Sequence, residues 1–337
     1  MGEVNIDEIT LEAIRLRHAA LAPHVRETPV QPLDSAPIAK ALGGGEVVLK
    51  LECLQHTGTF KARGALSNMR AIPEEKRAAG ITAASAGNHA IAAAWAAKAA
   101  GLSAKVVMQN NANPFRVTQA KAQEAEIVMR DPGAATFAEA ERLSKEEGRT
   151  FVHPFDGVDT VLGAAGVGLE FLEQVPDLDA VIISVGGGGL ISGVAVAVKL
   201  SNPNCEVFGV EPEGAAGMSL SLANGVASTL EGLDTIADSL APPFALPLGH
   251  ALCSAYVDDI VTVSDDAICA GMVVLQQDAK LAVEPAAGAA IAGLLGPLRA
   301  RLQGKRVGVV VCGANIDAGS YAAYLARGEK HLPALMA

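Results

Sequence analysis

The sequence has few aromatic residues, no paired cysteine motif and no concentration of positive charge. Aromatic residues make up 4% of its 337 residues, so close packing must come from small aliphatic side chains. The five cysteines are scattered and never form a Cys-x-x-Cys pair, which favours a reducing compartment. A formal net charge of −11 without any Lys/Arg-rich run argues against nucleic acid as a partner.

Apolar stretches long enough to cross a membrane are also missing, because Gly, Asp or Lys interrupts each run. Residues 1–21 place Glu3, Asp7, Glu8 and Glu12 among apolar side chains. This pattern predicts an amphipathic helix over Met1 to Leu21 and is unlike a signal peptide. We therefore expect a cytoplasmic protein with no membrane partner.

What the sequence does contain is an alternation of short Val/Ile-rich runs with longer alanine-rich stretches. The runs are typical of buried parallel strands; they are residues 47–51, 104–108, 127–129, 180–185, 207–210, 260–263 and 307–311. The stretches are long enough for crossover helices; they are residues 90–100, 135–147, 160–173 and 284–302. The alternation predicts an α/β fold with open, mostly parallel sheets.

The segment from Gly64 to His153 has its own alternation of strands and helices, with turns at Gly58 and Pro154. We expect residues 64–153 to form a smaller domain inserted into a larger one made of residues 1–63 and 154–337. Ligands bind beyond the carboxyl ends of strands in such sheets. A cleft between the two domains is therefore the expected site.

A run of four glycines follows one predicted strand and precedes a helical stretch. Gly186, Gly187, Gly188 and Gly189, with Leu190 after them, expose backbone N–H groups at a helix N-terminus, which favours an anion such as phosphate. A plain flexible turn is the alternative interpretation. A dinucleotide site is another, but Ile191 or Ser192 stands where the third glycine of Gly-x-Gly-x-x-Gly belongs.

Two further loops carry polar residues beside small ones. Lys61 follows Phe60 at an apparent helix start, and a lysine among apolar neighbours is a good nucleophile for a Schiff base; a solvated surface lysine is the alternative. The loop Ser85-Ala86-Gly87-Asn88-His89 precedes an alanine-rich helix. Its free amides would suit a carboxylate, although an ordinary helix cap would have the same residues.

Taken together, the motifs resemble those of the fold-type II pyridoxal-phosphate enzymes of the threonine/serine dehydratase and serine racemase group. The resemblance covers nearly the whole chain. It is carried, in this order, by Phe60-Lys61-x-Arg63-Gly64, by Ser85-x-Gly87-Asn88-His89, by the glycine run and by Cys312-Gly-Ala-Asn315. It implies two open, mostly parallel sheet domains with the active site between them.

The resemblance also implies a role for each matching position. Lys61 would hold pyridoxal 5'-phosphate and then remove the substrate's α-proton. Residues Gly186 to Gly189 and Leu190 would hold the cofactor phosphate, while Asn88 would bind the ring hydroxyl and Phe60 would lie beside the ring. Cys312 would contact the pyridine nitrogen, where the group commonly has serine. Ser85 to His89, Ala86 included, would bind the substrate carboxylate.

Two positions separate the branches of this group. The racemase branch has a second serine directly after the position of Ser85, and this chain has Ala86 there, so a dehydratase is favoured over a serine racemase. Some relatives bind a structural divalent cation through an acid that Glu211 matches. Gly217 stands where the second acid is expected, with Glu213 as a possible substitute. Glu211 is thus a candidate metal ligand, and by default a strand-end acid.

The resulting expectation is an ammonia-lyase that converts a β-hydroxy amino acid, L-threonine or L-serine in the first place, to a 2-oxo acid and ammonia. A bulkier or acidic substrate, phenylserine or hydroxyaspartate, is the alternative. The segment Ser239 to His250, rich in Pro, Ala and Leu, is expected to shape that side of the pocket. Asp238 and Glu284 lie in segments that face the cofactor in relatives; an ordinary loop acid and an ordinary helix-start acid are the alternative interpretations. The family's habits also predict a homodimer.

A noncatalytic protein that only binds the cofactor or an amino acid is a further alternative. Lys61 argues against it, because binding alone would not need a lysine that reacts with an aldehyde.

Overall fold

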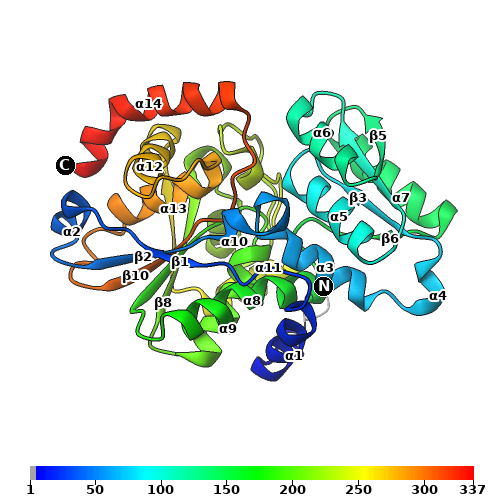
Figure 1. Cartoon of the computed structure of the whole chain (residues 1–337), viewed down its shortest axis with the longest axis horizontal. Helices are drawn as coiled ribbons and strands as arrows, with labels where there is room; N and C mark the ends of the chain where they lie inside the picture. Colours follow the sequence, from blue (N-terminus) through cyan, green and yellow to red (C-terminus); the bar gives the residue numbers. More distant parts are fainter. Residues whose placement is uncertain (1–4) are drawn as a thin grey trace.

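The computed structural model describes residues 5–337 and contains two sheets, each covered on both faces by helices (Figure 1). The larger sheet has the strand order β1-β2-β10-β7-β8-β9. Its strands are β1 (Val30–Pro32), β2 (Glu46–Lys50), β7 (Ala180–Ser184), β8 (Glu206–Pro212), β9 (Asp259–Val263) and β10 (Arg306–Val310). Only β1 pairs antiparallel; the other neighbours are parallel.

The smaller sheet is entirely parallel, with the order β5-β4-β3-β6. Its strands are β3 (Ile81–Ala84), β4 (Ala104–Gln109), β5 (Glu126–Arg130) and β6 (Thr150–Phe151). These strands lie inside the predicted insertion and have their own apolar core. The two mostly parallel sheets confirm the predicted fold class, and the boundaries at residues 64 and 153 stay a prediction.

Helices of the larger sheet form two layers. In one layer, α13 (Pro285–Leu295) packs directly on the strands. This layer also contains α2 (Ala36–Ala41), α12 (Asp265–Gln277) and α14 (Ala318–Met336). The other packs through α8 and α9 and contains α1 (Leu11–Leu21), α8 (Val158–Gln174), α9 (Gly189–Ser201), α10 (Gly217–Asn224) and α11 (Pro247–Tyr256). Figure 1 shows the two layers above and below the strands. Buried strands such as Ala-Val-Ile-Ile-Ser of β7 are apolar throughout because neither face meets water.

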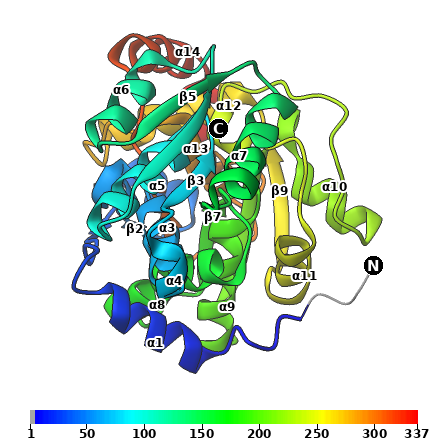
Figure 2. The same ribbon diagram turned by 90° about the vertical axis from the view of Figure 1, so that its right-hand side faces the viewer.

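The smaller sheet is covered by α5 (Asn88–Ala99) and α6 (Pro114–Ala122) on one face and by α7 (Ala134–Glu147) on the other (Figure 2). Helix α4 (Glu74–Arg77) is a single turn. Helix α3 (Lys61–Ala71) lies between the two parts of the chain and packs on both α8 and α5. Short 3-10 turns are η1 (Glu52–Leu54), η2 (His56–Gly58), η3 (Glu213–Ala215) and η4 (Asp238–Leu240).

The structure corrects two predicted helices. The helix expected over Met1 to Leu21 begins at Leu11, because the Thr10 hydroxyl accepts a hydrogen bond from the Ala13 amide and caps it there; residues 1–4 lie outside the described part. The helix expected over residues 284–302 ends at Leu295, since Gly296 and Pro297 interrupt it. No helix within residues 5–337 is both long and apolar enough to cross a membrane.

Candidate active site

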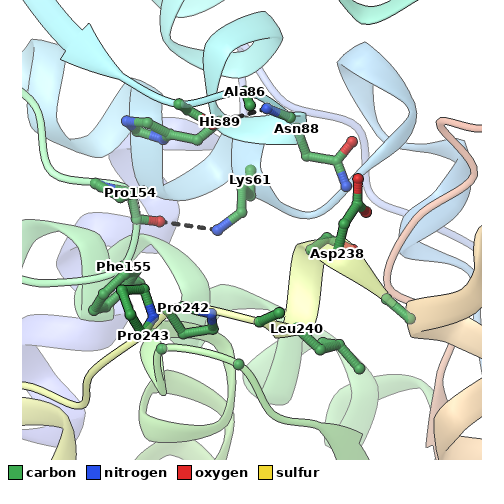
Figure 3. Close-up of a pocket in the computed structure, with 18 of the residues that line it drawn as sticks. Lys61, Ala86, Asn88, His89, Pro154, Phe155, Asp238, Leu240, Pro242 and Pro243 are labelled. Atoms are coloured by element: carbon green, nitrogen blue, oxygen red, sulfur yellow. Dashed lines mark hydrogen bonds between the residues drawn. The ribbon is translucent and has the colours of Figure 1, made fainter. Parts of the chain in front are cut away.

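A cavity of about 700 Å³ lies between the two sheets and is lined by loops that follow their strands (Figure 3). The sequence-predicted residues Phe60, Lys61, Ser85 to His89, Gly186 to Leu190 and Cys312 all line it. The loops after β3, β7 and β10 each leave the carboxyl end of a parallel strand, where open α/β folds bind ligands. The fold therefore collects at one place every predicted site residue except Glu211.

Lys61 is the first residue of α3, and its amine reaches into the cavity. Its Nζ donates a hydrogen bond to the Pro154 carbonyl at 2.9 Å and lies 5.0 Å from the centre of the Phe60 ring. Burial lowers the pKa of Lys61 to about 8, although Glu284 and Cys312 favour the charged form. A larger fraction of this amine is neutral near pH 7 than in an ordinary lysine, as a nucleophile requires.

A buried network of charges fixes the start of α3. Arg63 donates to Glu170 at 2.7 Å and to Glu52 at 2.8 Å, and Lys50 donates to Glu170 at 2.8 Å. All four side chains are at most 3% exposed. Gly163 of α8 allows the close approach, because an added Cβ there would lie 2.6 Å from the Arg63 carbonyl oxygen. Helix α3 is therefore held firmly against α8, and Lys61 with it.

The glycine run forms a turn that leads into α9. Gly188 has φ +91°, a conformation that side chains disfavour. An added Cβ at Gly187 would lie 2.2 Å from the Phe155 ring, and one at Gly189 would lie 2.7 Å from the Phe155 carbonyl oxygen. No larger residue fits here, so the backbone itself lines the cavity at a helix N-terminus.

The Ser85 to His89 loop joins β3 to α5. The Ser85 hydroxyl accepts a hydrogen bond from the Gly87 amide at 3.1 Å. His89 is buried, and its Nε2 lies 2.9 Å from the Val152 carbonyl, so this nitrogen carries the proton and donates. Burial lowers the pKa of His89 to about 3. His89 is thus a neutral, structural side chain.

Cys312 lies two residues after β10, and its carbonyl accepts a hydrogen bond from the Phe60 amide at 3.1 Å. Its thiol is 3% exposed at the cavity wall, and burial raises its pKa well above the ordinary value. Cys312 is therefore a neutral thiol, which can offer only a weak hydrogen bond to a ring nitrogen.

Comparison with known proteins identifies the family to which this chain belongs. A family model described as "Pyridoxal-phosphate dependent enzyme" matches residues 21–313. The chain belongs to the pyridoxal-phosphate-dependent enzymes. It is 48% identical to the phenylserine dehydratase of Ralstonia pickettii over 319 residues, 94% of this chain and 97% of the relative. It is 37% identical to the L-threonine ammonia-lyase of Thermotoga maritima over 310 residues, 92% and 76% of the two chains.

A solved structure supports the same assignment. The maize serine racemase structure superposes with a TM-score of 0.89 at 34% identity, covering 96% of this chain and 98% of that one. The resemblance expected from the motifs is thereby confirmed, as is pyridoxal phosphate as the cofactor. The chain is an enzyme of the lyase type.

The residues present fit this cofactor. The glycine turn lines the cavity with backbone at the N-terminus of α9, as a phosphate site needs, and Lys61 offers an amine of lowered pKa to an aldehyde. Figure 3 shows Pro154 and Phe155 on one side of Lys61 and Asn88 and Asp238 on the other. That these residues hold the cofactor in the expected roles remains our proposal.

Glu211 lies away from the cavity and has protein partners. It is fully buried in β8, and its carboxylate accepts hydrogen bonds from the amides of Met218 and Ser219 at 2.8 Å each and from the Ser219 hydroxyl at 2.6 Å. Within residues 5–337 no group of three or more His, Cys, Asp or Glu could hold a metal ion. The expected cation site stays a prediction.

Sequence reasoning missed several residues that line the cavity. Arg116 is 7% exposed and forms an ion pair with Asp238, which the sequence had placed near the cofactor. Pro154 and Phe155 come from the loop after β6, and Phe137 comes from α7. Only the Pro-rich segment Ser239 to His250 had been noted as a pocket wall, and it supplies Phe244. These residues are far apart in sequence, so no local motif marks them.

Proposed function

We propose that the protein is a dehydratase that converts a β-hydroxy amino acid with an aryl group, phenylserine in particular, to a 2-oxo acid and ammonia. The observation that carries the substrate class is an aromatic wall formed by Phe137, Phe155 and Phe244. Four of the chain's eight phenylalanines line the cavity, these three and Phe60. In a chain with 4% aromatic residues this concentration marks the site for an apolar, ring-shaped group.

The wall is assembled from both parts of the fold. The ring centres of Phe137 and Phe244 lie 6.4 Å apart, and those of Phe155 and Phe244 lie 6.2 Å apart. All three side chains are only partly buried. A phenyl group placed against them would remove apolar surface from water and add edge-to-face ring contacts, which is worth about 2 kcal/mol.

The charges of the cavity argue against the acidic alternative. Among the described residues that line it, the side chains with a positive charge are Lys61 and Arg116. Arg116 is already paired with Asp238 through both of its terminal nitrogens and lies 3.7 Å from Glu284. The second carboxylate of hydroxyaspartate would have no free cation as a partner. Phenylserine therefore fits the cavity better than hydroxyaspartate does.

Different residues of the chain would bind the substrate carboxylate and move the α-proton. The loop from Ser85 to Asn88 would hold the substrate carboxylate at the N-terminus of α5. Lys61 Nζ would take the α-proton, for which its lowered pKa suits it. Pyridoxal phosphate, when bound, supplies the electron sink that this proton loss requires. Ala86 has no hydroxyl, so the loop offers no second proton donor there for racemisation.

The test compares L-phenylserine with L-threonine by measuring kcat/KM for 2-oxo acid release. We expect phenylserine to be favoured by about tenfold or more, in line with the burial of one phenyl group. Phe244→Ala should reduce this preference by about tenfold, because part of the wall is lost. Phe115→Ala is the matched control, since Phe115 lies on α6 outside the cavity. Threonine favoured over phenylserine by the unaltered enzyme would overturn the aryl proposal.

A further inference from the structure

Glu284 is a buried acid at the cavity wall that the proposed reaction does not use. It is the N-cap residue of α13, and its side chain is 2% exposed. Its Oε1 accepts a hydrogen bond from Asn88 Nδ2 at 2.7 Å. Within residues 5–337 its Oε2 has no hydrogen-bond partner. Leaving a carboxyl oxygen buried and unpartnered costs free energy, so its retention calls for a function.

The amide of Asn88 is held at both ends. Asn315 Nδ2 donates to Asn88 Oδ1 at 2.9 Å and also to the Thr57 carbonyl at 2.8 Å. Because Oδ1 faces the donor Asn315 and Nδ2 faces the acceptor Glu284, the amide cannot be turned over without losing both bonds. One of the two N–H groups on Nδ2 is used by Glu284, and the other is left for a group inside the cavity.

We propose that Glu284 is a positioning residue that fixes the orientation of the Asn88 amide, so that its second N–H is presented to the ring of the cofactor. The inference rests on the family's cofactor binding at Lys61 and does not depend on which substrate the enzyme prefers. Glu284 acts through Asn88, whereas Asn88 makes the contact.

The ionisable groups that face Glu284 come from three elements and from the loop after β10. Arg116 of α6 lies 3.7 Å from its Oε2, and Asp238 of η4 pairs with the same arginine. Lys61 of α3 and the Cys312 thiol complete the surroundings. Burial raises the pKa of Glu284 to about 7, while Arg116 and the Asn88 hydrogen bond oppose the shift. Glu284 thus changes its charge near neutral pH, beside the site of the cofactor ring.

The experiment uses the holoenzyme and reads the cofactor instead of the reaction. The visible absorbance band is followed from about pH 5.5 to pH 9, and the dissociation constant for pyridoxal phosphate is measured after removal and re-addition. In the unaltered enzyme we expect the band to change with a midpoint near pH 7. Glu284→Gln keeps an acceptor for Asn88, so it should bind the cofactor within about threefold of the original affinity and lose this midpoint.

Glu284→Ala removes the acceptor and should weaken cofactor binding by about tenfold, which corresponds to one hydrogen bond to a buried amide. Glu139→Gln is the matched control. This substitution removes a largely buried carboxylate on α7 that does not line the cavity. The visible band of this variant should change with the same pH midpoint as in the unaltered enzyme. The Gln variant tests the proposal even if the Ala variant fails to fold.

An unchanged midpoint in Glu284→Gln, or unaltered cofactor affinity in Glu284→Ala, would overturn the role of Glu284. These results would leave the reaction itself standing. Conversely, an enzyme that prefers threonine to phenylserine contradicts the proposed substrate and not the role of Glu284. The two proposals therefore fail separately.

Discussion

Lys61 combines two properties that a single sequence motif cannot guarantee. It begins a helix anchored by a buried ion network, and burial lowers its pKa to about 8. The first property keeps the amine in one place, and the second makes it reactive near neutral pH. The motif around Phe60 and Lys61 predicted the role, and the three-dimensional setting supplies the reason.

The lowered pKa of Lys61 predicts how cofactor capture depends on pH. The apoenzyme should bind pyridoxal phosphate faster as pH rises through about 8, because the protonated amine, which dominates below that pH, cannot attack an aldehyde. Stopped-flow absorbance between pH 6 and pH 10 measures the rate. Nα-acetyl-lysine is the control, with its midpoint near 10.5. A midpoint as high as that of the free amino acid would show that Lys61 is not desolvated.

For single residues, the sequence predicted the lining of the cavity wherever the residues form a continuous motif. The glycine run, the Ser85 to His89 loop and Lys61 all line the cavity as expected. The aromatic wall could not be found this way, because Phe137, Phe155 and Phe244 meet only after the chain has folded. Arg116 was missed for the same reason: its partner Asp238 is 122 residues away in sequence.

Among the elements, α3 and α8 show how packing supports the site. The ion network that joins them also includes Lys50 of β2 and Glu52 of η1, so it contains two acids and two bases, all nearly unexposed. Buried charges of this kind contribute little when all are present, but removing one leaves the others without compensation. The network is therefore a rigid anchor for the residue that begins α3.

Glu170→Ala tests this anchor. It should lower the free energy of unfolding by about 3 to 5 kcal/mol, because Arg63 and Lys50 lose a shared partner inside the protein. Chemical denaturation followed by circular dichroism measures the change. Glu173→Ala, on an exposed position of the same helix, should cost less than about 1 kcal/mol. Equal losses for the two variants would mean that the network does not stabilise the fold.

The glycine turn before α9 leads to a prediction about cofactor binding. Gly187→Ala places a methyl group 2.2 Å from the Phe155 ring, so the turn and the packed ring can no longer keep their present places. We expect pyridoxal phosphate to bind at least about 100-fold more weakly, since several backbone donors to the phosphate move together. Equilibrium dialysis measures the affinity. Gly232→Ala, where an added methyl meets no atom within 4 Å, is the control; near-normal binding by Gly187→Ala would rule out this turn as the phosphate site.

Element boundaries were predicted less well than element types. Every Val/Ile-rich run that the sequence predicted as a strand is present, whereas β1, β3 and β6 are too short to show such a run. The helix expected to reach residue 302 ends at Leu295, because an apolar stretch continues past Gly296 and Pro297 without remaining helical. In this region the apolar composition predicts that the residues are buried, whereas the end of the helix can be predicted only from the turn residues.

For the molecule as a whole, the arrangement of the two sheets explains why one cavity holds every motif. Each motif follows a strand of one sheet or the other, and the carboxyl ends of both sets of strands face the same cavity. The comparisons place the chain in the pyridoxal-phosphate-dependent family over residues 21–313, which includes both sheets. Fold and family are thus recoverable from sequence, while the substrate class depends on contacts between the two parts.

The most direct test of the account measures the absorbance spectrum of the purified protein together with 2-oxo acid release from L-phenylserine, for the unaltered chain and for Lys61→Ala. We predict a visible cofactor band and oxo-acid release in the unaltered protein, and loss of the band with at least about a 1,000-fold lower rate in the variant. A colourless protein that pyridoxal phosphate cannot reconstitute, or a variant as active as the unaltered protein, would contradict the account.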